Sequence, residues 1–300
     1  MPSWQSYVVN SLLRLFVQRK LAKVSTPMEA REIFGSSPSV KMPDVEFISG
    51  HEGGVKGEWA CGRKKTANIM LYLHGGGYFA CEPATYRRIT GGFARHGFLV
   101  FAPAYRLAPE HPFPAAVDDA LAAYRGLLTA YAPEQIIIAG DSAGGGLTMA
   151  LVLAARAAGL PLPAGLILFS PWTDLAATGA SLKTNAKREN LLIVERMDDV
   201  AALYLAGADP KTPTASPLYG ELSGLPPVLI QVSDREILLD DSTRLAERIK
   251  ASGGQVELQV WKNLPHVWQF GQSFLPEARE ALKQAADFAS RTLASRAPTA

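Results

Sequence analysis

The chain has 300 residues, 48% of them hydrophobic, which is enough apolar material for a large buried core. Its 30 basic and 28 acidic residues leave a formal net charge of +2, so no charge excess attracts nucleic acid or an anionic membrane. We therefore expect neither nucleic acid nor a membrane as a partner. Cys61 and Cys81 are too few for a disulfide framework, which favours the cytoplasm.

The N-terminal segment is apolar but does not resemble a secretion signal. Its charges, Arg14, Arg19 and Lys20, lie inside or after the apolar part, and it has no small-residue cleavage pattern. Apolar residues between positions 8 and 16 recur at i, i+4 spacing, which predicts an amphipathic helix lying on another surface. The charge-free apolar stretch 143–155 is shorter than the roughly 20 residues that cross a bilayer, so we expect no membrane span.

Short apolar runs alternate with helical patterns along most of the chain. The predicted strands are 45–48, 69–73, 98–102, 135–139, 166–169, 228–232 and 256–260, and helical patterns include 114–129, 242–251 and 277–293. The central runs are continuously apolar, as in strands buried on both faces of a parallel sheet. We expect an α/β fold with an open, mostly parallel sheet, whose carboxyl edge is the usual place for a ligand.

Residues 179–217 interrupt this alternation with a charged loop, 183–189, and one predicted helix, 197–206. We expect a single domain over residues 1–300, with a helical cap formed by about 1–40 and about 179–217. Aromatic and aliphatic residues in the cap and near the predicted site favour an apolar pocket, with packing in the hydrophobic core as the structural alternative. These residues are Trp4, Tyr7, Phe16, Phe34, Leu203 and Tyr204 in the cap, and Tyr78, Phe79 and Trp268 in the loops.

A nucleophile turn is predicted at residues 140–144, Gly-Asp-Ser-Ala-Gly, between the strand 135–139 and an apolar helical stretch. Gly140 and Gly144 remove Cβ atoms where strand and helix approach, so the serine between them can adopt a strained backbone conformation. The pattern is that of the G-x-S-x-G elbow, which exposes the Oγ of Ser142 above a sheet. A glycine turn that only packs the helix on the strand is the structural alternative.

A second glycine-rich loop, His74-Gly75-Gly76-Gly77-Tyr78, follows the strand 69–73. Bare backbone N–H groups in such a loop can approach a ligand closely, and together with the Ala143 N–H they can form an oxyanion hole. A flexible turn and a phosphate-binding loop are the alternatives. Neither G-x-x-x-x-G-K-[ST] nor G-x-G-x-x-G occurs in the chain, which argues against phosphate binding.

A serine nucleophile needs a base and an acid that orients it. His266 alone among the five histidines follows Ser142 in the chain, as the α/β-hydrolase order Ser, acid, His requires. Acid candidates after the strand 228–232 are Asp234, Glu236, Asp240 and Asp241. The last two lie near the predicted start of a helix, where acidic residues are favoured for other reasons. Asp234 and Glu236 both remain open.

Taken together, these motifs resemble the hormone-sensitive-lipase-like branch of the α/β-hydrolases, known as bacterial esterase family IV, in its GDSAG form. The resemblance covers most of the chain and rests on HGGGY at 74–78, YRLAPEHPFPAA at 105–116, GDSAGG at 140–145 and SPWTDL at 170–175. It implies Ser142 as the nucleophile, His266 as the base, and Gly76, Gly77 and Ala143 as oxyanion donors.

The same resemblance implies Glu236 as the acid. In the family an Asp commonly opens a D-P-L-x-D segment, and matching its last Asp to Asp240 places Glu236 on the first. Both the Glu and the missing Pro depart from the pattern, so Asp234 stays the alternative. The resemblance also implies a cap built from an N-terminal segment and an insertion, and a homodimer.

The predicted function is therefore a carboxylesterase that hydrolyses short- to medium-chain acyl esters through an acyl-enzyme. No metal or organic cofactor is expected, and no H-E-x-x-H motif occurs. An amidase or deacetylase with the same triad is one alternative. A non-catalytic small-molecule receptor on the same fold is another, since fold alone does not establish function.

Overall fold

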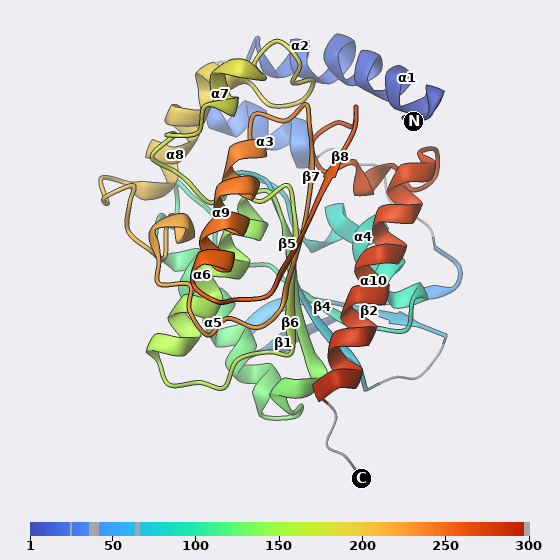
Figure 1. The fold of residues 1–300 in the computed structure, drawn as a ribbon, viewed down its shortest axis with the longest axis vertical. Coiled ribbons are helices and arrows are strands. Elements are labelled where there is room, and N and C mark those ends of the chain that lie inside the picture. Colours follow the sequence, from blue (N-terminus) through green and yellow to red (C-terminus); the bar gives the residue numbers. More distant parts are fainter. Residues whose placement is uncertain (25, 36–41, 64–66, 297–300) are drawn as a thin grey trace.

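The computed structural model describes residues 1–24, 26–35, 42–63 and 67–296, and its centre is one eight-stranded sheet (Figure 1). Its strands are β1 (Val45–Glu52), β2 (Val55–Gly62), β3 (Ile69–Leu73), β4 (Leu99–Pro103), β5 (Ile136–Asp141), β6 (Gly165–Phe169), β7 (Val228–Ser233) and β8 (Val256–Trp261). Their spatial order is β1-β2-β4-β3-β5-β6-β7-β8, and β2 runs antiparallel to both of its neighbours. The predicted mostly parallel sheet is confirmed.

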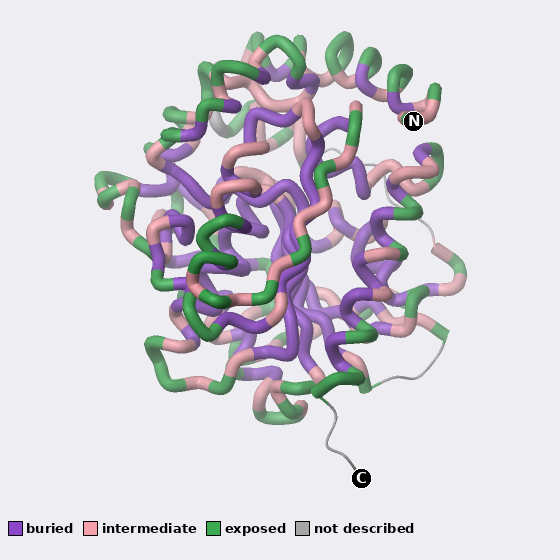
Figure 2. Tube along the Cα trace, viewed as in Figure 1, coloured by how far each residue is buried: buried purple, intermediate pink, exposed green. Residues whose placement is uncertain are grey.

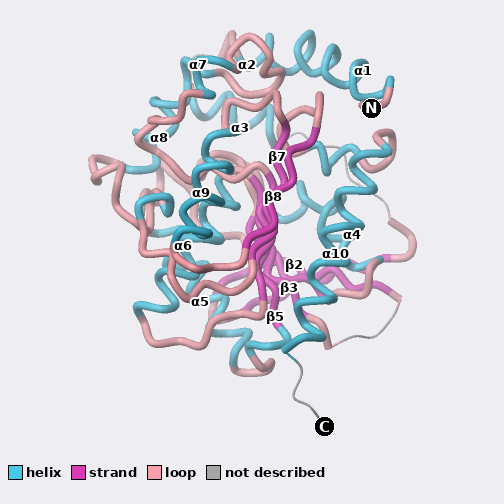
Figure 3. Tube along the Cα trace, in the orientation of Figure 1, coloured by secondary structure: helices cyan, strands magenta, loops and turns pink. Residues whose placement is uncertain are grey.

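Helices cover both faces of this sheet (Figures 1 and 3). On one face lie α4 (Arg87–Arg95) and α10 (Pro276–Arg296), and on the other lie α5 (Ala115–Leu128), α6 (Ala143–Ala157) and α9 (Leu239–Ala251). Every residue of β3, β5, β6 and β7 is buried, as their continuous apolar sequences predict (Figure 2). Short 3₁₀ segments occupy Pro83–Tyr86, Pro133–Gln135, Pro217–Tyr219 and Trp268–Gly271.

Several elements lack a clear signal in the sequence, among them β2 and the glycine-containing part of α4. β2 carries glycines and charged residues and has only one buried position, so it lacks the apolar run of a central strand. α4 contains the pair Gly91-Gly92, which disfavours helix in isolation. Tertiary packing overrides this preference, because a Cβ at Gly91 would clash with Met42 and Phe47. α4 thus needs a small surface at Gly91, where Met42 and Phe47 pack against it.

The segments at the carboxyl edge of the sheet lie together at one end of the molecule (Figure 1). They are α1 (Trp4–Leu12), the π-helical η1 (Leu13–Gln18), α2 (Arg19–Leu21), α3 (Pro27–Gly35), α7 (Ser181–Thr184), η4 (Val194–Arg196) and α8 (Met197–Leu205). Hydrogen bonds join the N-terminal segments to the 181–205 region. They run from Asn190 Nδ2 to Asn10 Oδ1 at 2.9 Å and from Gln18 Nε2 to the Leu192 carbonyl at 3.0 Å. The predicted boundary near residue 40 lies outside the described residues.

The helix predicted at 197–206 is found as α8, and the predicted N-terminal amphipathic helix is found as α1, η1 and α2. Within the described ranges, no helix is both long enough and apolar enough to cross a membrane.

Candidate active site

Ser142 lies at the turn between β5 and α6 with φ 51° and ψ −124°, a conformation that residues with a side chain rarely adopt. The turn holds this geometry by close backbone contact. A Cβ at Gly144 would collide with the carbonyl oxygens of Leu73 and His74, so only glycine fits there. The Ser142 N–H donates to the Phe169 carbonyl at 2.9 Å, which ties the turn to the end of β6. The side chain of Ser142 therefore projects from the carboxyl edge of the sheet.

Ser142, His266 and Glu236 form one hydrogen-bonded row. The Oγ of Ser142 lies 2.9 Å from Nε2 of His266, and Nδ1 of His266 lies 2.6 Å from Oε2 of Glu236. His266 is 5% exposed and Glu236 is 1% exposed, so the imidazole and the carboxylate meet away from water. The three residues come from the loops after β5, β8 and β7.

The carboxylate of Glu236 is held on both oxygens. Its Oε1 accepts the Ser233 N–H at 2.7 Å and the Ser170 hydroxyl at 2.8 Å, which leaves Oε2 for His266. Asp234 instead accepts the Asn263 N–H at 2.9 Å and pairs with Arg188 at 3.3 Å. Asp240 and Asp241 lie in the first turn of α9, as predicted. Among the acid candidates, the structure brings Glu236 to His266.

The protonation of His266 is set by two opposing effects. Burial alone would lower its pKa, but the hydrogen bond to Glu236 and the charge of that carboxylate outweigh burial. The pKa of His266 is therefore raised above its usual 6.5. An imidazole of this kind takes up a proton readily, as a base acting on Ser142 would have to do.

Gly76, Gly77 and Ala143 lie around the same point. Gly76 and Gly77 line the cavity beside Ser142, and Gly76 has φ 108°, which favours glycine. Ala143 is the first residue of α6, and the first N–H groups of a helix have no intrahelical partner. The Pro-rich segment braces the glycine loop, because the Tyr105 hydroxyl donates to the His74 carbonyl at 2.6 Å.

Asp141 lies behind this loop, where it is buried and accepts hydrogen bonds from two tyrosine hydroxyls and a backbone N–H. Its Oδ1 accepts the Tyr72 hydroxyl at 2.7 Å and the Gly75 N–H at 3.1 Å, and its Oδ2 accepts the Tyr86 hydroxyl at 3.1 Å. Burial raises the pKa of Asp141 to about 6, although the two tyrosine hydrogen bonds act in the opposite direction. The carboxylate thereby fixes the start of the glycine loop against β5.

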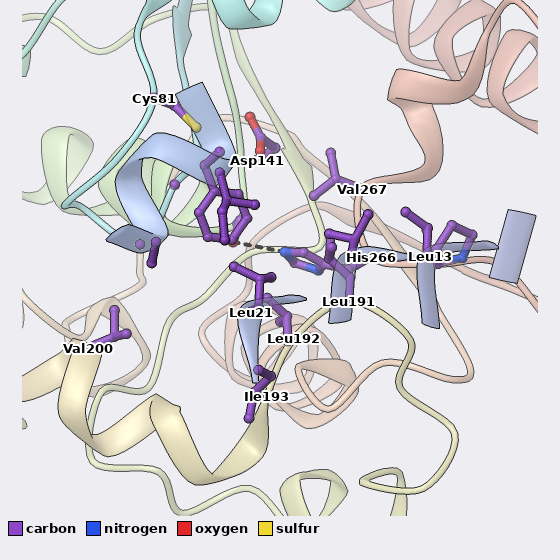
Figure 4. A pocket seen from close by; sticks show the side chains of 18 of the residues that line it. Leu13, Leu21, Cys81, Asp141, Leu191, Leu192, Ile193, Val200, His266 and Val267 are labelled. Atoms are coloured by element: carbon purple, nitrogen blue, oxygen red, sulfur yellow. Dashed lines mark hydrogen bonds between the residues drawn. The ribbon is translucent and has the colours of Figure 1, made fainter. Parts of the chain in front are cut away.

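Ser142 and His266 face a cavity of about 690 Å³ with mostly apolar walls. The N-terminal segment contributes Leu13 and Leu21 to these walls, and the 185–193 loop contributes Leu191 and Leu192 (Figure 4). An apolar pocket is thus confirmed. Of the five histidines, all of them described, only His266 lines it. The described residues hold no group of three or more His, Cys, Asp and Glu side chains suited to a metal ion.

The residues that form the pocket differ in part from those expected. Phe34, Phe79 and Trp268 line it, as predicted. Tyr78 and Tyr204 do not, because they are buried against each other with ring centroids 3.8 Å apart. The expectation was also wrong for Trp4, Tyr7 and Phe16, which lie exposed on the outer side of the N-terminal helix. Leu203 packs against the core instead.

Sequence reasoning missed several residues that contact the acid loop, among them Ser170 and Glu189. Ser170 donates to Glu236 and directly follows β6, so its position at the carboxyl edge was an available signal. Glu189 is 1% exposed and accepts the Ile237 N–H at 3.2 Å on one oxygen. Its other oxygen accepts the Asn190 and Leu191 N–H groups at 2.8 and 2.9 Å. Within a charged loop, nothing in the sequence distinguishes it from solvent-exposed neighbours.

Comparison with known proteins places this geometry in a family. A family model described as alpha/beta hydrolase fold matches residues 70–270. An acetyl-hydrolase of Streptomyces hygroscopicus is 42% identical over 261 residues, 86% of each chain. An esterase of Acinetobacter venetianus is 33% identical over 297 residues, 96% of each chain.

Solved structures agree with these relatives. The esterase EstE5, in a crystal soaked with p-nitrophenyl butyrate, superimposes with a TM-score of 0.93 at 37% identity, covering 97% of this chain and 99% of that one. An esterase of the bacterial hormone-sensitive lipase family gives 0.91 at 40% identity, covering 98% and 99%. The chain therefore belongs to the α/β-hydrolase family, and within it to the esterases related to hormone-sensitive lipase.

Proposed function

We propose that this carboxylic ester hydrolase cleaves short- to medium-chain acyl esters with Ser142 as nucleophile, His266 as base and Glu236 as the orienting acid. One observation carries the proposal: the unbroken hydrogen-bonded row from Ser142 through His266 to Glu236 at an apolar cavity. In the first half of the reaction, Ser142 Oγ bonds to the ester carbonyl carbon while its proton moves to His266 Nε2.

The tetrahedral intermediate carries a negative oxygen. In the proposal, the N–H groups of Gly76, Gly77 and Ala143 stabilise it, and each such donor typically contributes about 3 kcal/mol to transition-state binding. Collapse of the intermediate breaks the bond to the alcohol, which leaves with the proton from His266. Water then attacks the acyl group on Ser142 with His266 again as base, releasing the acid and restoring the hydroxyl.

The preference for short and medium acyl chains rests on the cavity and the relatives. A volume of about 690 Å³ with apolar walls suits such an acyl group together with its alcohol. The Streptomyces relative is named an acetyl-hydrolase, and EstE5 was soaked with a butyrate ester. We assign the helical cap to about 1–40 and about 179–217, because residues of α1, η1, α2, α3 and α8 line the cavity. Cytoplasmic location and homodimer formation complete the proposal, the first supported by the two free cysteines.

The proposal is tested by hydrolysis of p-nitrophenyl butyrate and laurate by wild type, Ser142→Ala and the exposed-serine control Ser11→Ala. We expect Ser142→Ala to lose at least about four orders of magnitude in kcat/KM while remaining folded by circular dichroism, and Ser11→Ala to match wild type. Butyrate should be the better substrate. Retained activity in Ser142→Ala would refute the nucleophile, and faster cleavage of butyryl p-nitroanilide than of the ester would identify an amidase.

A further inference from the structure

The N-terminal helix, residues 4–21, has two apolar faces. Its inner face supplies Val9, Leu13, Val17 and Leu21 to the walls of the cavity. Its outer face carries large apolar side chains that touch solvent, and Figure 2 colours much of this helix as exposed. These are Trp4, Tyr7, Val8, Leu12, Leu15 and Phe16, with exposed fractions of 65, 58, 38, 48, 46 and 68%. Contiguous exposed apolar surface of this size marks a site of interaction.

The charged residues in and directly after this helix are all basic. Residues 1–24 contain Arg14, Arg19, Lys20 and Lys23 and no Asp or Glu, and all four basic side chains are exposed. Arg19 follows Leu15 by four positions and Phe16 by three, so it continues the outer face. The chain's net charge of +2, from which we expected no membrane partner, averages over this local excess.

Acidic residues of neighbouring elements lie near the helix at two places. At its N-terminal end, Glu277 of α10 accepts the Ser3 N–H at 2.6 Å. Glu29 and Glu32 of α3 share a shallow depression with Lys20 and Lys23. At the other side, Arg14 donates to the carbonyl of Lys187, whose own exposed side chain adds to the basic group. The outer face thus has apolar residues at its centre and a basic margin.

We propose that the outer face docks on an anionic phospholipid surface, which brings the cavity against the lipid and lets esters dissolved there enter it. An amphipathic helix with aromatic and aliphatic residues on the face and basic residues beside it lies in the plane of such an interface. A second copy of the chain fits less well, because its helix offers no carboxylate to pair with Arg19 or Lys23. The inference goes beyond the proposed hydrolysis and does not depend on it.

The test is vesicle binding measured by co-sedimentation in the Ser142→Ala background, so that lipids stay intact. Vesicles of phosphatidylcholine alone are compared with vesicles of equal parts phosphatidylglycerol and phosphatidylcholine. We expect binding to the anionic vesicles that weakens with salt. The triple variant Arg19→Gln, Lys20→Gln, Lys187→Gln should bind on the order of 100-fold more weakly, since each basic residue near such a surface contributes roughly fivefold.

The apolar variant Leu12→Gln, Leu15→Gln, Phe16→Gln should also lose binding, whereas Ile48→Gln, a substitution at a residue of similar exposure on β1, should keep it. With Ser142 restored, the apolar variant should hydrolyse dissolved p-nitrophenyl butyrate at the wild-type rate. Equal binding to both vesicles, or undiminished binding by the apolar variant, would overturn the proposal. So would a concentration-dependent dimer that the apolar variant abolishes while vesicle binding is absent.

Discussion

The hydrogen bonds around Glu236 show how one side chain controls the state of another. Ser170 and Ser233 donate to one oxygen of the carboxylate, and the other oxygen accepts from His266. This arrangement fixes the imidazole with Nδ1 as donor and Nε2 facing Ser142. Because the carboxylate also raises the pKa of His266, orientation and basicity depend on the same group.

Glu236→Gln should separate these effects through the pH dependence of kcat/KM. Activity needs neutral His266, so in wild type it should fall as pH drops through a value above 6.5. Removing the negative charge lowers the pKa of His266, which moves this acid limb to lower pH. We expect kcat/KM to decrease by about 10⁴, as expected when the imidazole loses its orienting acid.

The matched control is Asp234→Asn, which removes a carboxylate two positions away without touching His266. Its pH profile and kcat/KM should stay close to wild type. A large loss in Asp234→Asn together with near-normal activity in Glu236→Gln would instead assign the acid to Asp234.

At the scale of elements, the loop from Asn185 to Ile193 connects the N-terminal helix to the acid loop. Asn185 Nδ2 donates to the Glu236 carbonyl at 2.8 Å, and Asn190 Nδ2 donates to Asn10 in α1. Between them, Glu189 holds both its own turn and the Ile237 N–H. The loop therefore links the N-terminal helix through hydrogen bonds to the residue next to the proposed triad acid.

Glu189→Gln tests this coupling. The amide oxygen can still accept the N–H groups of the turn, but the amide nitrogen cannot accept from Ile237, and the charge that helps raise the pKa of His266 is lost. We expect kcat to fall by about tenfold, which corresponds to roughly 1.4 kcal/mol, and the acid limb to shift to lower pH. Glu195→Gln, at an exposed position in the same region, should change neither. An unshifted limb would reduce Glu189 to a packing role.

An element could be predicted from the sequence when the residues that determine it lie close together in the chain. The elbow at Ser142 and the strand before it are encoded within a dozen residues, by an apolar run and two glycines. His266 was singled out by chain order alone, and Glu236 needed the family pattern. In contrast, α4 and the burial of Glu189 depend on partners far along the chain, Met42 in one case and Ile237 in the other. The roles of the triad and oxyanion residues stay predictions.

For the whole molecule, the sheet ends in two different edges. β1 forms one edge beside antiparallel β2, and β8 forms the other beside parallel β7. β8 has no buried residue and exposes 46% of Val260. An open strand edge of this kind is a template for pairing with a second chain, which supports the proposed homodimer through β8 and α10.

We expect the wild-type protein to elute with a mass twice the 32.2 kDa of the chain, measured by light scattering during size exclusion. Val260→Lys, which places a charge on the β8 edge, should shift the equilibrium to the monomer. Ile48→Lys is the control, since Ile48 is 45% exposed on the opposite edge. A monomeric wild type, or a dimer broken only by Ile48→Lys, would contradict this assembly.

The order of strands also decides which part of the active site is lost first. Ser142 follows β5, which has neighbours on both sides, whereas His266 follows β8, which among the described strands is hydrogen-bonded only to β7. Edge strands open locally at a lower free energy than the centre of a sheet. In rising denaturant, the base would separate from an intact nucleophile before the core melts, so inactivation should precede unfolding. A dimer that covers β8 would bring inactivation and unfolding to the same denaturant concentration, and dilution to the monomer would separate them again.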